Sequence, residues 1–285
     1  MSKIIISTES GSDLSKELME QYQINVVPLH VVMDGKSYFD GSFPISDLYQ
    51  YYNKTKKVPS TSAANPDQFS DFFHTLQKEN PGCKIIHISY SSAASSTYQN
   101  AKIAIDELDD VYLVDSLNVS GGAAAITVKA AQIVASSDEN CNIEDIIKEI
   151  EFYVKKARVS FLPGSLEYLK AGGRVSNVVY LGASLLKIKP LVKIIDGKLI
   201  VSKKYRGQMS SIVNDYINEF ITENHLDKSI IYFLYSLGLE ESIKEAARQQ
   251  AKNLGFQIIT FIQTGCVITC HSGPGALGIA GFATN

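Results

Sequence analysis

Small hydroxyl side chains gather where apolar, strand-like runs end. The clusters are Ser7–Asp13 after Ile4–Ile6, Ser89–Thr97 after Ile85–Ile88, Asp115–Ser116 after Val111–Val114, and Ser60–Ser62 before a helix start at Asn65. In an open α/β sheet, ligands collect at the carboxyl ends of the strands. Hydroxyls and free N–H groups at helix starts suit an anionic head group there. Serine and threonine are also common helix caps, but several clusters on one sheet edge favour a shared anion site.

Two further side chains are candidates for binding or chemistry. His271 lies in the segment His-Ser-Gly-Pro-Gly, directly after an apolar run, and Arg174 follows Gly172 and Gly173. The neighbouring glycines let backbone approach a ligand closely. The competing interpretations are a structural histidine and a solvated surface arginine.

Several familiar motifs are absent or fail in context. Residues 273–278 match the dinucleotide pattern GxGxxG, but only seven residues follow, too few for the helix and second strand of a βαβ unit. The chain contains neither a GxxxxGK[ST] phosphate loop nor a GxSxG nucleophile elbow. Cys266, Cys270 and His271 lack a further ligand pair with zinc-like spacing, so we expect no metal.

The elements that must position these residues alternate between strand and helix. We predict strands at Ile4–Ile6, Val26–Val32, Lys84–Ser89 and Val111–Val114, with amphipathic helices between them, one of which starts with the capping box Asn65–Gln68. This alternation predicts βα units around a mostly parallel sheet.

After a helix at Ile143–Lys156, the chain continues as a second α/β part. The predicted elements there are helices near Leu166–Lys170 and Val178–Leu186, a hairpin of Leu191–Ile195 and Lys198–Ser202 turning at Asp196-Gly197, strands at Ile258–Ile262 and Cys266–Thr269, and a terminal glycine-rich stretch. We therefore predict an α/β fold with an N-terminal domain of residues 1–157 and a C-terminal domain of residues 158–285.

Composition narrows the functional classes. The chain has 285 residues, 45% of them hydrophobic and 20% charged, with a formal net charge of -3. Because there is no basic surplus, nucleic-acid binding is disfavoured. No signal-peptide core is visible, and no apolar run approaches the roughly 20 residues that a membrane span needs. With four scattered cysteines and no CxxC, we expect a cytoplasmic protein.

Along nearly its whole length, the chain resembles the DegV family. The resemblance rests on the order and spacing of TESGSDL, VPSTSAANP, IHISYSSAASSTYQNA, LEYLKAGGRVS, KIKPLVKIIDGKL and HSGPGALG. It implies a two-domain DegV-type (EDD) fold that holds one long-chain fatty acid, such as palmitate, between the domains. It also implies a role as the fatty-acid-binding subunit (FakB) of a bacterial fatty-acid kinase, whose ATP-binding partner phosphorylates the bound acid for phospholipid synthesis.

By position, the resemblance implies a set of head-group residues. The carboxylate-binding hydroxyls are Thr61 or Ser62 in one block and Ser91, Ser92 or Ser95 in another, with His271 and Arg174 near the head group, where we expect both to contribute to phosphoryl transfer by the partner kinase. Three departures from the family pattern stand out. Glu9 replaces the usual aspartate, Ala63-Ala64 replace Gln-Pro, and Ala94 and Ser96 replace a leucine and a glycine.

The leading hypothesis is a cytoplasmic fatty-acid carrier that is not itself an enzyme. It needs no cofactor, binds no nucleic acid and does not insert stably into membranes. The first alternative is an enzyme acting on a small phosphorylated or carboxylated metabolite, with His271 as general acid or base. A ligand-independent regulatory or scaffolding protein is the second alternative, but it leaves the hydroxyl clusters without a purpose.

Overall fold

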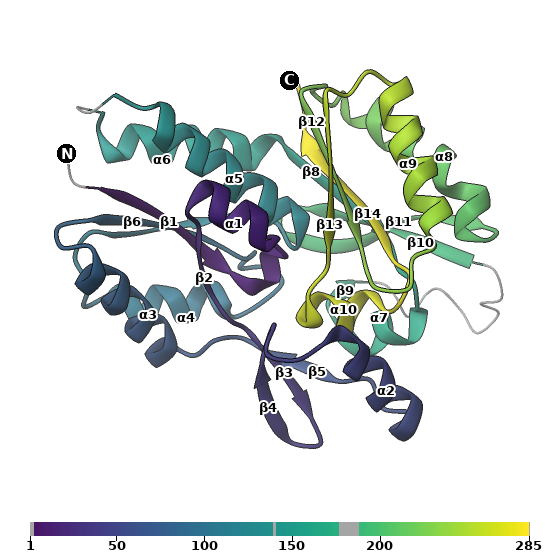
Figure 1. Ribbon diagram of the computed structural model, residues 1–285, viewed down its shortest axis with the longest axis horizontal. Coiled ribbons are helices and arrows are strands. Elements are labelled where there is room, and N and C mark those ends of the chain that lie inside the picture. Colours follow the sequence, from purple (N-terminus) through teal and green to yellow (C-terminus); the bar gives the residue numbers. More distant parts are fainter. Residues whose placement is uncertain (1–2, 139–140, 177–187, 285) are drawn as a thin grey trace.

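The protein, described here from a computed structural model over residues 3–138, 141–176 and 188–284, contains three β-sheets (Figure 1). The first sheet is fully parallel, as predicted, with strand order β2-β1-β6-β7. Its strands are β1 (Ile4–Glu9), β2 (Asn25–Val27), β6 (Lys84–Ser89) and β7 (Val111–Asp115).

Helices cover both faces of this parallel sheet, which explains why β1 and β6 contain consecutive isoleucines that are buried on both faces. They are α1 (Lys16–Tyr22), α3 (Pro66–Glu79), α4 (Thr97–Ile105), α5 (Gly121–Ser136) and α6 (Ile143–Lys156), with the 3-10 turn η1 (Ser10–Ser12) after β1. Ile6 packs with α5 and α6, whereas the adjacent Ile5 packs with α3 and α4. The predicted capping box is confirmed, because the Asn65 and Gln68 side chains each accept a hydrogen bond from the other residue's backbone N–H.

A small antiparallel sheet, ordered β4-β3-β5, carries the Ser60–Ser62 cluster. Its strands are β3 (His30–Met33), β4 (Lys36–Phe39) and β5 (Ser60–Ser62), and α2 (Ile45–Thr55) lies between β4 and β5 in the chain. The prediction of one strand over Val26–Val32 was wrong. The run divides into β2 and β3 at Pro28, which has no N–H to donate to a β-ladder.

The third sheet is mixed, with the order β13-β12-β14-β8-β10-β11-β9. Its strands are β8 (Ala157–Leu162), β9 (Val175–Ser176), β10 (Ile188–Ile195), β11 (Lys198–Arg206), β12 (Ile230–Tyr235), β13 (Ile258–Gln263) and β14 (Leu277–Phe282). The associated helices are α7 (Leu166–Gly172), α8 (Met209–Asn224), α9 (Glu241–Asn253) and α10 (Cys266–Ser272). The predicted hairpin is confirmed as β10–β11.

One prediction near the end of the chain was wrong, because Cys266–Thr269 is not a strand but most of α10. The glycine-rich stretch, to which no element was assigned, contains β14, which lies between β12 and β8. A short apolar run has the same pattern in a buried strand and in a buried helix. The helix predicted over Val178–Leu186 lies outside the described residues.

Helix α5 packs between the parallel and the mixed sheets (Figure 1). One core contains Ile6 and Ile86 of the parallel sheet, Ala124 and Ile126 of α5, and Leu234 of the mixed sheet. Helices α8 and α9 cover the opposite face of the mixed sheet. No helix among the described residues is long and apolar enough to span a membrane. The domain boundary near residue 158 stays a prediction, although β8 of the mixed sheet begins there.

Candidate functional site

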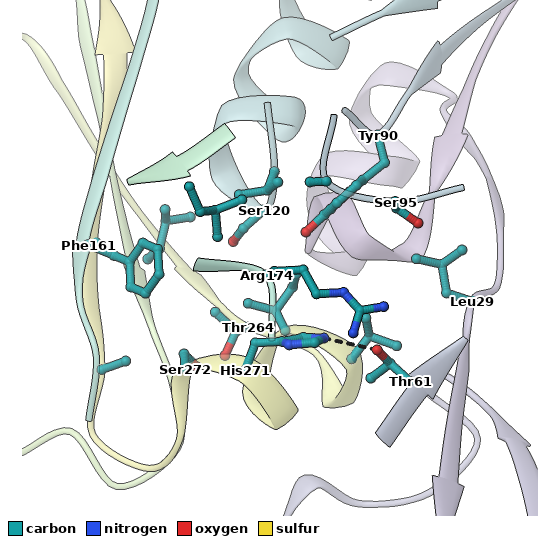
Figure 2. Close-up of a pocket in the computed structure, with 18 of the residues that line it drawn as sticks. Leu29, Thr61, Tyr90, Ser95, Ser120, Phe161, Arg174, Thr264, His271 and Ser272 are labelled. Atoms are coloured by element: carbon teal, nitrogen blue, oxygen red, sulfur yellow. Dashed lines mark hydrogen bonds between the residues drawn. The ribbon is translucent and has the colours of Figure 1, made fainter. Parts of the chain in front are cut away.

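A mainly apolar cavity lies where the start of α5 meets the mixed sheet and the ends of the parallel strands (Figure 2). Its empty volume, open mouth included, is about 890 Å³, within the range of small-molecule sites, about 300–1,000 Å³. The apolar lining residues are Leu29, Val119, Val159, Phe161, Leu199, Leu234, Val267 and Ile268. Figure 2 shows Phe161 across the cavity from Thr61 and Leu29.

The cavity wall has a trough at the start of β14, because the residues that face the cavity there are small. Ala276, directly before β14, and Gly278 of β14 line the cavity, and Gly278 pairs laterally with Phe161 of β8 and Leu234 of β12. A Cβ atom added to Gly278 would lie 3.1 Å from Leu234 Cδ1 and 3.2 Å from Phe161 Cβ. Glycine therefore keeps this part of the cavity open between two larger side chains.

Thr61 and His271 meet at the polar end of the cavity. The distance between Thr61 Oγ1 and His271 Nε2 is 2.9 Å, and both residues line the cavity. His271 lies in the last turn of α10, close to Gly172 of α7, where an added Cβ would be 2.2 Å from His271 Nδ1. Glycine at residue 172 therefore gives the imidazole its place beside Thr61.

The imidazole of His271 is uncharged at neutral pH. Burial, with a smaller contribution from the nearby Arg174 guanidinium, lowers the pKa of His271 to about 4. Its Nδ1 atom is buried and has no hydrogen-bond partner among the described residues. With hydrogen on Nε2, the imidazole donates to Thr61, which leaves the Thr61 hydroxyl hydrogen available for a ligand.

Arg174 supplies positive charge to the cavity. It follows Gly173, which ends α7 in the left-handed conformation, and its Nη1 donates to the Gly172 carbonyl at 2.8 Å. Figure 2 shows the guanidinium between Tyr90 and His271. Within the described part of the chain, no carboxylate lies within ion-pair distance of Arg174. A guanidinium without an acidic partner favours an anionic ligand.

Ser62 and Ser95 also line the cavity. The Ser95 Oγ atom accepts a hydrogen bond from the Thr97 N–H at 3.3 Å, so its own hydrogen is free to be donated. Glu9 lies beneath this loop and anchors both of its ends. Its carboxylate accepts hydrogen bonds from the Tyr90 N–H at 2.8 Å and the Thr97 hydroxyl at 3.3 Å.

Ser91 and Ser92, which were predicted alongside Ser95, are not among the residues that line the cavity. Ser91 is fully buried, and its hydroxyl donates to the Gly197 carbonyl at 2.8 Å. Ser92 is exposed, and its backbone N–H donates to Asp115 Oδ1 at 3.3 Å. The structure therefore brings together Thr61, Ser62, Ser95, Arg174 and His271 and leaves these two serines outside.

Sequence reasoning missed several polar groups that line the cavity, among them Tyr90 and Ser120. Burial raises the pKa of the Tyr90 phenol, which keeps it protonated. Ser120, at the start of α5, has a φ of 49° and donates its hydroxyl to Asp13 Oδ2 at 2.5 Å. Burial raises the pKa of the Asp13 carboxyl well above its usual range. The available signal for Ser120 was its place directly before Gly121-Gly122, which allow the start of α5 to pack closely.

This arrangement defines a class of α/β protein in which an apolar cavity ends in hydroxyls and a guanidinium. Residues 3–284 match the family described as "Uncharacterised protein, DegV family", and the chain belongs to the DegV family. A DegV domain-containing protein of Clostridium perfringens is 33% identical over 279 residues, 96% of each chain. A second, from Caldanaerobacter subterraneus subsp. tengcongensis, is 32% identical over 286 residues, 98% of each chain.

Solved structures agree with this assignment. DegV of Bacillus subtilis, described as a fatty-acid-binding protein, is 27% identical with a TM-score of 0.81, over 99% of this chain and 100% of the other. A Thermotoga maritima protein described as revealing a fatty-acid-binding function is 26% identical with a TM-score of 0.84, over the same shares. The α/β fold predicted from the sequence is thereby confirmed.

Proposed function

We propose that this protein binds one long-chain fatty acid, such as palmitate, in the cavity between residues 1–157 and residues 158–285. The observation that carries the proposal is an apolar cavity with two hydroxyls and Arg174 at one end, where Arg174 has no carboxylate partner within the described ranges. The descriptions of the related Bacillus subtilis and Thermotoga maritima structures as fatty-acid-binding proteins support it.

The energetics suit such a ligand. Burying a methylene contributes about 0.8 kcal/mol, so some 15 methylenes contribute on the order of 12 kcal/mol before the costs of binding. Removing a carboxylate from water costs several kcal/mol unless donors meet it. The hydroxyls of Thr61 and Ser95 are suitable donors, because each already accepts an N–H in the arrangement described above.

The neutral state of His271 favours the carrier over the alternative enzyme. A general acid or base at neutral pH works best with a pKa near 7, whereas that of His271 is lowered to about 4. We assign His271 the role of a neutral hydrogen-bond donor that orients Thr61, and Arg174 the role of the cation at the head group. Ser62 supplies a further hydroxyl at the same end of the cavity, and the proposed binding requires no cofactor.

We further propose that the cytoplasmic protein presents the carboxylate to an ATP-dependent fatty-acid kinase, which forms an acyl phosphate. Phosphorylation adds charge and oxygen atoms at the head group, and phosphoryl transfer depends on positioning and electrostatic stabilisation. The guanidinium of Arg174 is charged across the physiological pH range and can pair with those oxygens.

The binding proposal predicts that protein purified from a bacterial host carries a long-chain fatty acid in about a one-to-one ratio. Mass spectrometry of an organic extract of the denatured protein measures this directly. A delipidated sample should also take up added palmitate. Absence of an acyl chain from the extract, together with no uptake of palmitate, would contradict the proposal.

The kinase proposal predicts that Arg174→Ala affects turnover more than binding. Palmitate affinity should fall only slightly, while acyl-phosphate formation with ATP and a cognate kinase falls at least about tenfold, equivalent to about 1.4 kcal/mol in the barrier. Arg158→Ala is the matched control, because this guanidinium also donates to backbone carbonyls, has no acidic partner in the part of the chain that the structure describes, and does not line the cavity. Equal losses of binding and turnover in Arg174→Ala would assign it to ligand binding alone.

A further inference from the structure

Ser91 connects two parts of the chain that both contribute residues to the cavity wall, Ala94 from one and Leu199 from the other. It lies in the loop between β6 and α4, and its buried hydroxyl donates to the carbonyl of Gly197 in the β10–β11 turn at 2.8 Å. The same oxygen accepts the Ala93 N–H at 3.3 Å. The Ser91 hydroxyl is thus hydrogen-bonded both within its own loop and to the turn. We call its hydrogen bond to the Gly197 carbonyl the docking contact.

On the loop side, the docking contact is coupled to a head-group hydroxyl. The backbone N–H groups of Ala94 and Ser95 both donate to the Ser91 carbonyl, each at 3.1 Å. Because Ala94 and Ser95 line the cavity, a displacement of Ser91 also displaces the Ser95 hydroxyl.

On the turn side, the docking contact is coupled to the guanidinium. Strand β11 pairs with β9 through Leu199 and Val175, and Val175 follows Arg174 in the chain. Leu199, two residues after Gly197, itself lines the cavity. The position of the turn therefore affects the strand pair that carries Arg174.

The close approach of loop and turn requires glycine at residue 197. Its φ is 77°, and an added Cβ would lie 2.4 Å from Ser91 Oγ and 3.1 Å from the Ala93 Cβ. Any side chain there would force the turn away from the loop, whatever the conformation of the turn itself.

We infer that Ser91 is a positioning residue for carboxylate binding, because the docking contact sets Ser95 and Arg174 at the spacing that an acyl head group needs. This inference rests on the proposed fatty-acid-binding function. It gives Ser91 a role in the head-group site without any contact between its side chain and the ligand.

The chain contains its own control for the turn. Asp34-Gly35 joins β3 to β4 with φ values of 48° and 74°, and Asp196-Gly197 joins β10 to β11 with 47° and 77°. Around Gly35, however, no atom lies within 4 Å of an added Cβ. Gly35→Ala therefore reports the backbone strain alone, whereas Gly197→Ala adds the collision with Ser91.

The experiment compares the affinities of delipidated variants for palmitate and for hexadecanol, which has the same chain length and no carboxylate. We expect Ser91→Ala and Gly197→Ala each to lower the preference for palmitate over hexadecanol by about two- to tenfold, the effect of losing about one hydrogen bond. Ser92→Ala and Gly35→Ala should keep the wild-type ratio. The double variant should resemble the single ones, because both break the same contact.

Three outcomes overturn the inference. Equal weakening of both ligands in Ser91→Ala would make the residue merely structural, and an unchanged ratio would remove it from the head-group site. Additive effects of the two substitutions would show that they act separately. If the wild-type protein binds neither ligand, the proposed function fails first, and this result is distinct from the other three.

Discussion

The hydroxyl of Thr61 and the imidazole of His271 form a hydrogen-bonded pair, and burial keeps the imidazole uncharged. A protonated imidazole would carry its charge beside the Arg174 guanidinium, inside a cavity that excludes much of the water. Burial and this like charge together lower the pKa of His271 to about 4. The positive charge at the head group is thereby left to Arg174.

This lowered pKa predicts a pH dependence of stability. Between about pH 6.5 and pH 4, the unfolded chain binds a proton on His271 that the folded protein does not bind. The free energy of unfolding therefore falls as the pH falls through this window, by up to about 3 kcal/mol. Urea unfolding of the wild type and of His271→Gln at pH 7 and pH 4.5 measures the difference.

His271→Gln should lose less stability on acidification than the wild type, since glutamine does not titrate. The buried carboxyls of Asp13 and Asp40 have raised pKa values and act in the opposite direction, but both proteins retain them. An identical loss of stability in the two proteins would show that His271 is not held neutral by the fold.

At the scale of residues, residue types and spacing indicated most of the side chains at the polar end of the cavity, but not which hydroxyl of a cluster lines it. Thr61, Ser95, Arg174 and His271 all line the cavity, as the motif blocks led us to expect. Ser91 does not, because its hydroxyl is taken by the Gly197 carbonyl, 106 residues further along the chain. No local pattern contains that contact, so hydroxyls within one cluster cannot be ranked from sequence.

At the scale of elements, strands buried on both faces and helices with strong caps were predictable. The apolar runs of β1 and β6 and the capping box of α3 have clear physical signatures. It was not predictable in the same way that Cys266–Ser272 forms a helix (α10) and Leu277–Phe282 a strand (β14). Cys266–Ser272 is buried on nearly all sides, which removes the periodicity that distinguishes a helix, and glycine is unusual inside a strand.

We predict that a larger residue in place of Gly278 in β14 shortens the acyl chain that the cavity can hold. Gly278→Leu would fill the trough between Phe161 and Leu234 and displace roughly three methylenes of a long acyl chain, a loss of about 2–3 kcal/mol for palmitate. Decanoate, whose chain is six carbons shorter, should bind nearly as before. Competition binding with the two acids measures both affinities.

Gly281→Ala is the control for this change, because it adds a carbon to β14 on the opposite face, near Leu226. It should leave the ratio of the two affinities unchanged. Equal weakening of both acids by Gly278→Leu would mean that Gly278 lies beside a part of the ligand that both acids share, and not beside the far end of the longer acyl chain.

In the whole molecule, α5 is the element that both sheets share. Eleven of its sixteen residues are buried, and it packs against strands of both the parallel and the mixed sheet. A helix that is apolar on all sides must be covered on all sides, so its central burial was foreseeable from composition. The sequence did not indicate which strands cover the second side of α5, because β8, β12 and β14 come from distant parts of the chain.

The central place of β14 in the mixed sheet also bears on how the protein is made. The strand joins β12 to β8, so these two strands have no direct connection until residues 277–282 are available. During synthesis, all the other strands leave the ribosome first. A nascent chain therefore exposes two unpaired strand edges and an incomplete cavity wall until residues 277–282 have left the ribosome.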